Sequence, residues 1–301
     1  MSWKTLIIKD SEYINVFLDS VVIRTKQGEV KQPIGDLNSV IFESYKTTIT
    51  TRVINKLAEK GVLTILCDDT LMPNALITPI KGHHKQYEQI LNQINWNKKD
   101  KLFLWTKIVK NKIENQIDNL KMTNKNFDKV AHLNKFISEL QLGDSTNREA
   151  HAAKVYFHEL FGMEFRRNKD NHINSALNFG YSIIRSAVAR TICSKGLHPS
   201  ISLFHHNGFN AFALADDLME PFRPIVDLYV FSKIMNEDYF SRNHRIALIN
   251  LLNCKVTING KSVYLTNAIE IYIDEVINFF KEKKFSDEKF PDVSSVLYYE
   301  L

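Results

Sequence analysis

The chain contains only three cysteines among its 301 residues, Cys67, Cys193 and Cys254. Their spacing does not match the Cys-x-x-Cys pairs of structural zinc sites, and their apolar surroundings indicate buried thiols in a reducing compartment. The Gly-rich loops that cradle nucleotide phosphates and the Gly-x-Ser-x-Gly turn of serine hydrolases are also absent. These absences argue against a disulfide scaffold, a zinc-binding module and the commonest nucleotide-binding and hydrolase motifs.

Long hydrophobic runs are missing too. The longest apolar segments fall well short of a membrane span, and the first residues do not have the layout of a signal peptide. We therefore expect a cytoplasmic protein without membrane segments. Neither sign of charge dominates, since the net charge is only +5. This charge permits a polyanionic partner without requiring one. By contrast, 19 Phe and 11 Tyr residues indicate a substantial folded core.

Short segments rich in Ile and Val dominate the first 68 residues and predict strands, separated by Asp, Gly and Ser. These segments, with one helix at 48–60 before the last of them, are 5–9, 13–18, 20–25, 29–33, 39–42 and 62–67. Prolines and basic residues between positions 70 and 85 indicate a connection. We expect a β-rich N-terminal dimerisation domain over residues 1–78 and a linker over residues 79–88.

Helical periodicity dominates the remainder of the chain. Apolar residues between Leu102 and Leu120 recur at helical spacing with lysines between them, and further helices are predicted at 147–161, 173–193 and 268–283. The pair Asn259-Gly260 between alternating apolar residues predicts a hairpin with a type I′ turn. The fold class is therefore α+β, with a small N-terminal β-rich domain followed by a larger α-helical catalytic domain over residues 89–285. Residues 286–301 are expected to form a flexible tail.

A stretch of 23 residues from His205 to Asp227 holds two histidines, several acids and an arginine among apolar residues. Polar side chains in an apolar frame are typical of a metal site, because the frame fixes their rotamers. Adjacent residues of a helix or a strand point in different directions, so only one of His205 and His206 can face a given site. His205 shares the apolar side with Ile201 and is favoured. A hydrogen-bonded core histidine is the simpler interpretation.

Three acids of this stretch, Asp216, Asp217 and Glu220, have helical spacing. Pro221 disfavours helical geometry at Glu220 but suits the first position of a new helix. Glu220 would then lie at a corner near the positive end of that helix, where a phosphate is also favoured. Ordinary acids of a solvated turn explain the spacing equally well.

Glu149 is the third candidate ligand. The segment Thr146-Asn-Arg-Glu149 fits a capping box, so the simpler interpretation is a residue that closes the start of a helix. Glu149 also shares a helix face with Tyr156, which favours an inward carboxylate. Two carboxylates and one imidazole suit Mg²⁺ or Mn²⁺ with positions open to water and phosphate oxygens.

One further polar run, Glu164-Phe-Arg166-Arg167-Asn-Lys169, follows Gly162. Clustered arginines and lysines can contact phosphates, so this run is a candidate phosphate-contacting patch. A charged surface segment is the simpler interpretation.

Five motifs, in this order and at these separations, resemble the CRISPR-associated endonuclease/integrase family of the spacer-acquisition (adaptation) complex. They are Asn147-Arg-Glu149-Ala-x-Ala-Ala-Lys-x-Tyr156-Phe, Asn174-x-Ala-Leu-Asn178-x-Gly180-Tyr181, Gly196-Leu-His198-Pro-x-Ile201, His205, and Asp217-Leu-Met-Glu220-Pro-Phe-Arg223-Pro-x-Val-Asp227. The β-then-α layout extends the resemblance over nearly the whole chain. The chain looks most like the members found beside type II effector systems.

The resemblance implies that a Glu, a His and an acidic residue hold a divalent metal, and these map onto Glu149, His205 and Glu220. Many members carry Asp at the position of Glu220. Asp217 would support these ligands or replace one of them. Arg223 would orient Glu220 or approach a phosphate, and an ion pair with Asp227 is its simpler role.

The resemblance also implies a metal-dependent DNA integrase that uses Mg²⁺ or Mn²⁺. The 3′-hydroxyl of a short double-stranded DNA fragment would attack a phosphodiester of the CRISPR repeat beside its leader. The implied partners are a second copy of the chain, a small companion adaptation protein whose dimer bridges two integrase dimers, a type II effector and a protein that binds DNA ends. Two alternatives stay open: a stand-alone metal-dependent nuclease for branched or single-stranded DNA, and a non-catalytic DNA-binding scaffold.

Overall fold

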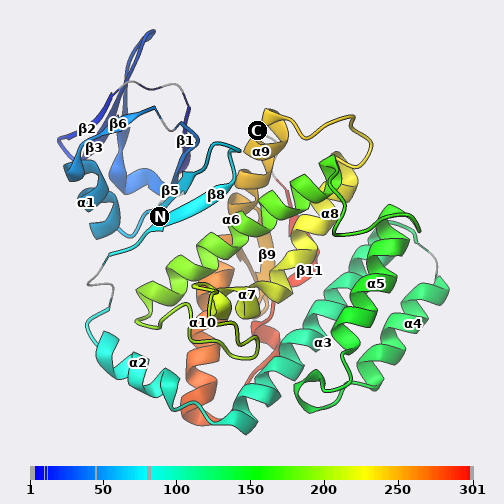
Figure 1. The fold of residues 1–301 in the computed structure, drawn as a ribbon. Coiled ribbons are helices and arrows are strands. Elements are labelled where there is room, and N and C mark those ends of the chain that lie inside the picture. The colour runs from blue at the N-terminus through cyan, green and yellow to red at the C-terminus, as the bar shows by residue number, and fades with distance from the viewer. Residues whose placement is uncertain are drawn as a thin grey trace. The chain divides into compact units, whose positions relative to one another are not determined.

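The computed structural model describes residues 4–9, 11, 13–44, 46–79, 83–125 and 127–298. The chain divides into two compact units, of which the first comprises Met1–Tyr87 with Cys193–Leu197 and the second Glu88–Ile192 with His198–Leu301. Strands dominate the first unit and helices the second (Figure 1). The predicted α+β class, with the β-rich part first, is confirmed.

The first unit contains two four-stranded sheets, of strand order β4-β3-β2-β6 and β1-β5-β7-β8. The strands are β1 (Lys4–Ile8), β2 (Tyr13–Phe17), β3 (Ser20–Thr25), β4 (Gly28–Pro33), β5 (Leu37–Phe42), β6 (Thr48–Ile49), β7 (Leu63–Cys67) and β8 (Pro73–Ile77). Helix α1 (Thr51–Glu59) buries Val53 and Leu57 in the same aliphatic cluster as Ile14 of β2. The alternation of Ile and Val that predicted the strands therefore supplies this core.

Part of the predicted connection is regular structure. Strand β8 pairs antiparallel with β7 at the edge of its sheet, and an edge strand tolerates Pro73 as its first residue. Helix α2 (Gln86–Ile94) begins inside the expected linker 79–88, so the linker interpretation is wrong for residues 86–88. Residues 80–82 of that linker lie outside the described residues.

Long helices form the second unit. They are α3 (Lys98–Met122), α4 (Phe127–Ser138), α5 (Arg148–Phe161), α6 (His172–Ser194), α7 (Ala213–Met219), α8 (Arg223–Lys233), α9 (Arg242–Asn250) and α10 (Leu265–Glu282). Helix α6 approaches α8 closely at Gly180, where an added Cβ would lie 2.5 Å from Val226 Cγ1. This glycine therefore sets the separation of two helices that carry site residues. Across the part of the chain that the structure describes, no helix is long and apolar enough to span a membrane.

A three-stranded sheet completes the second unit, with strand order β10-β9-β11. Strands β9 (Lys255–Ile258) and β10 (Lys261–Tyr264) form the predicted hairpin, and Asn259 and Gly260 have φ values of 52° and 66° as a type I′ turn requires. The flexible tail predicted at 286–301 is wrong for its described part. Strand β11 (Asp292–Leu297) pairs with β9 and buries Val293 and Val296, while 299–301 lie outside the described residues.

Candidate active site

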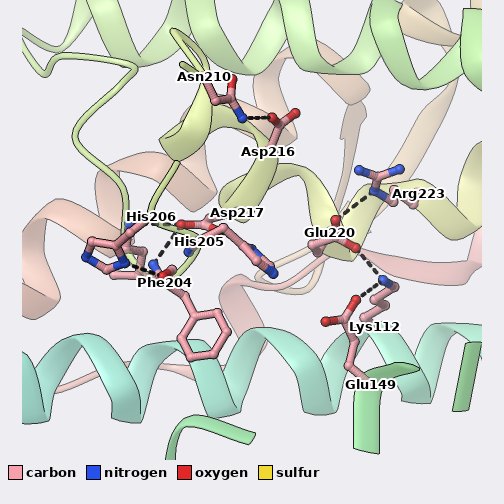
Figure 2. Close-up of polar contacts among 11 residues, drawn as sticks. Lys112, Glu149, Phe204, His205, His206, Asn210, Asp216, Asp217, Glu220 and Arg223 are labelled. Atoms are coloured by element: carbon pink, nitrogen blue, oxygen red, sulfur yellow. Dashed lines mark hydrogen bonds and ion pairs between the residues drawn. The ribbon is translucent and has the colours of Figure 1, made fainter. Parts of the chain in front are cut away.

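Two carboxylates from separate segments, those of the partly buried Glu149 and the buried Glu220, meet at one ammonium group (Figure 2). Lys112 Nζ lies 2.5 Å from Glu149 Oε1 and forms a second ion pair with Glu220. Burial alone lowers the pKa of Lys112, but the charges of Glu220 and Glu149 outweigh it and raise the pKa. The centre therefore holds a charged lysine between two acids.

Glu149 is free to reach Lys112 because another acid caps its helix. The carboxylate of Asp144 accepts hydrogen bonds from the backbone N–H groups of Arg148, at 2.7 Å, and Glu149, at 3.0 Å. Asn147 between them adopts a left-handed conformation with φ of 54° and makes no side-chain cap. The capping-box interpretation of Thr146 and Glu149 is therefore wrong, since Asp144 satisfies the N–H groups at the start of α5.

Glu220 lies where α7 passes into α8 through a short 3₁₀ turn. Its φ and ψ of −53° and −40° are helical, contrary to the expectation from Pro221. The preference of a residue before proline is weak enough for the buried helical path on both sides to override it. Arg223 Nε donates to Glu220 Oε1 at 2.8 Å. Burial alone raises the pKa of Glu220, but the charges of Arg223 and Lys112 lower it on balance, so Glu220 is ionised.

His205 lies in an irregular loop before α7, and the buried carboxylate of Asp217 fixes it. Asp217 accepts hydrogen bonds from the backbone N–H groups of Leu203, Phe204 and His205, and it contacts His205 Nδ1 at 2.7 Å. The imidazole meets the Trp105 ring edge-on, with ring centroids 5.0 Å apart. The bond to Asp217 raises the pKa of His205, and it leaves Nε2 as the nitrogen available to a ligand.

The other candidates of this stretch point elsewhere. His206 is exposed and its Nδ1 contacts the Phe204 carbonyl at 2.5 Å. Asp216 accepts a hydrogen bond from Asn210 at 2.7 Å and lies away from the two glutamates (Figure 2). Arg223 has the orienting contact with Glu220 that the resemblance implied, whereas Asp227 accepts the hydroxyl hydrogen bond of Tyr181.

The structure thus brings Glu149 and Glu220 together and keeps His205 with Asp217 in a neighbouring cluster. The charges of both glutamates still reach His205 and contribute to its raised pKa. Among the described residues, no three His, Cys, Asp or Glu side chains lie close enough to hold a metal ion as they stand. The cation that the two glutamates share in this structure is the Lys112 ammonium.

Lys112 is a site residue that the sequence motifs did not predict. It lies seven residues after Trp105 and so on the same face of α3, where the side chains are buried. Its residual exposure is 8%, which is rare for a lysine without charged partners. A lysine within the apolar stripe of a predicted helix was the available signal, and the acids that neutralise it lie 37 and 108 positions further along the chain.

Two acids around one cation, with an anchored histidine nearby, are side chains suited to metal-assisted chemistry at phosphodiesters. The sequence model of the CRISPR associated protein Cas1 family matches residues 5–266. The chain therefore belongs to the Cas1 family, as its motifs predicted.

One curated relative, the CRISPR-associated endonuclease Cas1 of Neisseria meningitidis serogroup C (strain 8013), is 30% identical over 100% of this chain and 99% of its own length. Among solved structures, a casposase bound to integration product has a TM-score of 0.74 at 20% identity, covering 99% of this chain and 94% of its own. A Cas6-RT-Cas1–Cas2 complex has a TM-score of 0.70 at 18% identity and covers 95% of this chain and 36% of that chain. These two likenesses establish the fold.

Proposed function

We propose that this Cas1 protein is a metal-dependent DNA integrase of CRISPR adaptation. It would join the 3′-hydroxyl ends of short double-stranded DNA fragments to the CRISPR repeat by transesterification. The observation that carries the proposal is the pair of acids, Glu149 and Glu220, that shares one cation near the anchored His205. The fold shared with a casposase bound to integration product favours strand transfer over simple hydrolysis.

Glu149, Glu220 and His205 Nε2 would hold a Mg²⁺ or Mn²⁺ ion. Carboxylate oxygens with one imidazole suit these cations, and the Lys112 ammonium already occupies a cationic position between the two carboxylates. Binding of the ion by all three ligands requires the ammonium to leave that position. When bound, the ion would supply a Lewis acid that activates the attacking 3′-hydroxyl and neutralises charge on the phosphate.

The surrounding residues would keep the ligands oriented. Asp217 holds His205 by Nδ1, so that the ring cannot rotate away and Nε2 stays available. Arg223 holds one oxygen of Glu220, which leaves the second for the cation. Lys112 and Arg223 together offset the charge of Glu149 and Glu220, so an added divalent cation would give the centre a positive excess that attracts the phosphate backbone.

We also propose that the chain acts within a larger protein–DNA assembly. The chain would act in the cytoplasm as a homodimer, and a small companion protein would bridge two such dimers on the fragment, the repeat and its leader. The solved complex that pairs Cas1 with Cas2 is a precedent of the same fold. A net charge of +5 is consistent with this arrangement, because several subunits would share the neutralisation of one DNA.

A strand-joining assay tests the proposal. The protein and its companion are incubated with a repeat plasmid, a divalent cation and fragments that end in 3′-hydroxyl or in a blocked 3′ end. We expect joining only with the free hydroxyl, and its loss in Glu149→Gln and Glu220→Gln but not in Glu159→Gln, a control ten positions along α5. Equal plasmid conversion with blocked ends would overturn strand transfer in favour of hydrolysis. Full joining by Glu220→Gln would rule out the acid centre.

A further inference from the structure

A polar pocket with a volume of about 270 Å³ lies between α6 and the α7–α8 segment. Three arginines, Arg167, Arg185 and Arg223, line it together with the acid Asp216. The space is many times the minimum that one water molecule needs, so it is ample for a phosphate group. Its lining therefore carries an excess of positive charge, and two of its arginines, Arg167 and Arg185, make no contact with the acid–histidine centre in the part of the chain that the structure describes.

Two of the guanidinium groups are held in place by the same aromatic ring. Arg167 lies over the Tyr181 ring at 5.5 Å and donates to Asn178 at 2.7 Å. Arg223 lies over that ring at 4.5 Å. Tyr181 is itself buried, and its hydroxyl donates to Asp227. These guanidinium planes are thus preorganised, which reduces the entropy lost when they bind an anion.

Arg223 connects the pocket to the centre described above. Its Nε donates to Glu220, and its two terminal nitrogens point away from that carboxylate (Figure 2). A planar guanidinium can bind a carboxylate along one edge and a phosphate along another. An anion in the pocket would therefore lie one side chain away from Glu220.

Asp216 interacts only weakly with Arg185 of the pocket. Its carboxylate is 3.9 Å from Arg185 Nη1, at the limit of an ion pair, and accepts a firm hydrogen bond from Asn210 at 2.7 Å. About a quarter of its side chain and a third of the Arg185 side chain are exposed, so solvent weakens their attraction further. A phosphodiester has the same single charge as this carboxylate, but its two tetrahedral oxygens can contact more than one guanidinium, so it can replace the carboxylate at Arg185.

We propose that this pocket is a binding site for a phosphate group of a nucleic acid strand, and that Asp216 is a resident competitor that weakens the site. The phosphate displaces Asp216 from Arg185 and contacts Arg167 and Arg223 as well. Asp216 weakens the site because its negative charge repels the phosphate and its carboxylate contacts Arg185. The assignment to a DNA strand rests on the proposed integrase function, whereas the anion site itself does not.

Binding measurements on the full-length protein in EDTA test the pocket without a divalent cation at the acid centre. The probes are a fluorescent single-stranded oligonucleotide and inorganic pyrophosphate as its competitor. We expect Asp216→Asn to tighten oligonucleotide binding about five-fold and Arg185→Gln to weaken it about ten-fold, the size of one charge-assisted contact. Arg185→Lys keeps the charge but not the planar fork, and it should fall between wild type and Arg185→Gln.

Asp238→Asn is the matched control, because it removes one negative charge at an exposed position outside the pocket lining. Equal tightening by Asp238→Asn and Asp216→Asn, or unchanged binding by Arg185→Gln, would overturn the proposal. A response of pyrophosphate binding alone would overturn the nucleic acid assignment. If these variants shift binding as expected while the wild type joins no strands, the integrase function fails and the pocket stands. If strand joining occurs but the variants do not shift oligonucleotide binding, the pocket proposal fails and the integrase function stands.

Discussion

Lys112 Nζ lies 2.5 Å from Glu149 Oε1, so a lysine of α3 serves as the counter-ion of an acid at the start of α5. The same ammonium pairs with Glu220. Two carboxylates that share one counter-ion repel each other when no cation lies between them. The lysine therefore stabilises the folded chain without a metal and competes with any cation that the acids bind.

Lys112→Met should make stability depend strongly on a divalent cation. Removing one partner of a buried ion pair costs about 3–5 kcal/mol, and Mn²⁺ can replace the lost charge. We expect the variant to melt well below wild type in EDTA and to gain far more than wild type when Mn²⁺ is added. Thermal unfolding with and without Mn²⁺ measures both. Lys110→Met, which removes an exposed lysine of the same helix, is the control. The idea fails if Mn²⁺ shifts both variants and wild type equally.

Asp217→Asn should loosen His205, the histidine that we propose as a metal ligand. The amide cannot accept all the hydrogen bonds that the carboxylate accepts from the loop and from His205, so the imidazole loses its fixed orientation. Loss of a partner that orients a metal ligand typically costs about 10–100-fold in metal affinity. Titration of Mn²⁺ followed by electron paramagnetic resonance measures this. Asp238→Asn should leave the affinity unchanged, and wild-type affinity in Asp217→Asn would contradict the role assigned to the carboxylate.

Asp227 should make stability fall as pH rises. Burial raises its pKa to about 6, against an ordinary value of 3.8, so the folded chain keeps the proton to a higher pH than the unfolded chain. Its contribution is therefore complete below about pH 4, decreases up to about pH 6 and is constant above, a change of about 3 kcal/mol. Asp227→Asn lacks this titration but can still accept from Tyr181. Urea unfolding should show that the stability of the variant relative to wild type is higher at pH 7.5 than at pH 4.5. An equal stability difference at the two pH values would disprove the raised pKa of Asp227.

Gly180→Ala should destabilise the helical unit. The new Cβ would lie 2.5 Å from Val226 Cγ1. Overpacking of this kind costs about 1–3 kcal/mol, which exceeds the stabilisation from the higher helix propensity of Ala. Val226→Ala should relieve the clash, so the double variant should be more stable than the sum of the single changes predicts. Gly35→Ala, where an added Cβ meets nothing within 4 Å, is the control. Additive effects would show that the two positions do not clash.

Local patterns account for most of the fold. The strands of the first unit, the long helices and the hairpin at Asn259 and Gly260 were predictable, because alternation, helical spacing and turn residues act over a few positions. Strands β8 and β11 were not, because a strand at a sheet edge depends on a partner elsewhere in the chain. The charged residues around β11 hid the few apolar side chains, such as Val293, that bury it.

The sequence by itself determined which side chains are the candidate ligands, since the motifs around Glu149, His205 and Glu220 are contiguous and ordered. Only the tertiary structure decided how they are held. Asp144 caps α5 in place of Thr146, Asp217 anchors His205, and Lys112 neutralises both glutamates. The pairing of the lysine with its acids depends on helices that pack together from distant parts of the chain. The position of Lys112 in an apolar helix stripe could indicate a buried lysine, but no local pattern could reveal which acids it pairs with, because that depends on the packing of the whole core.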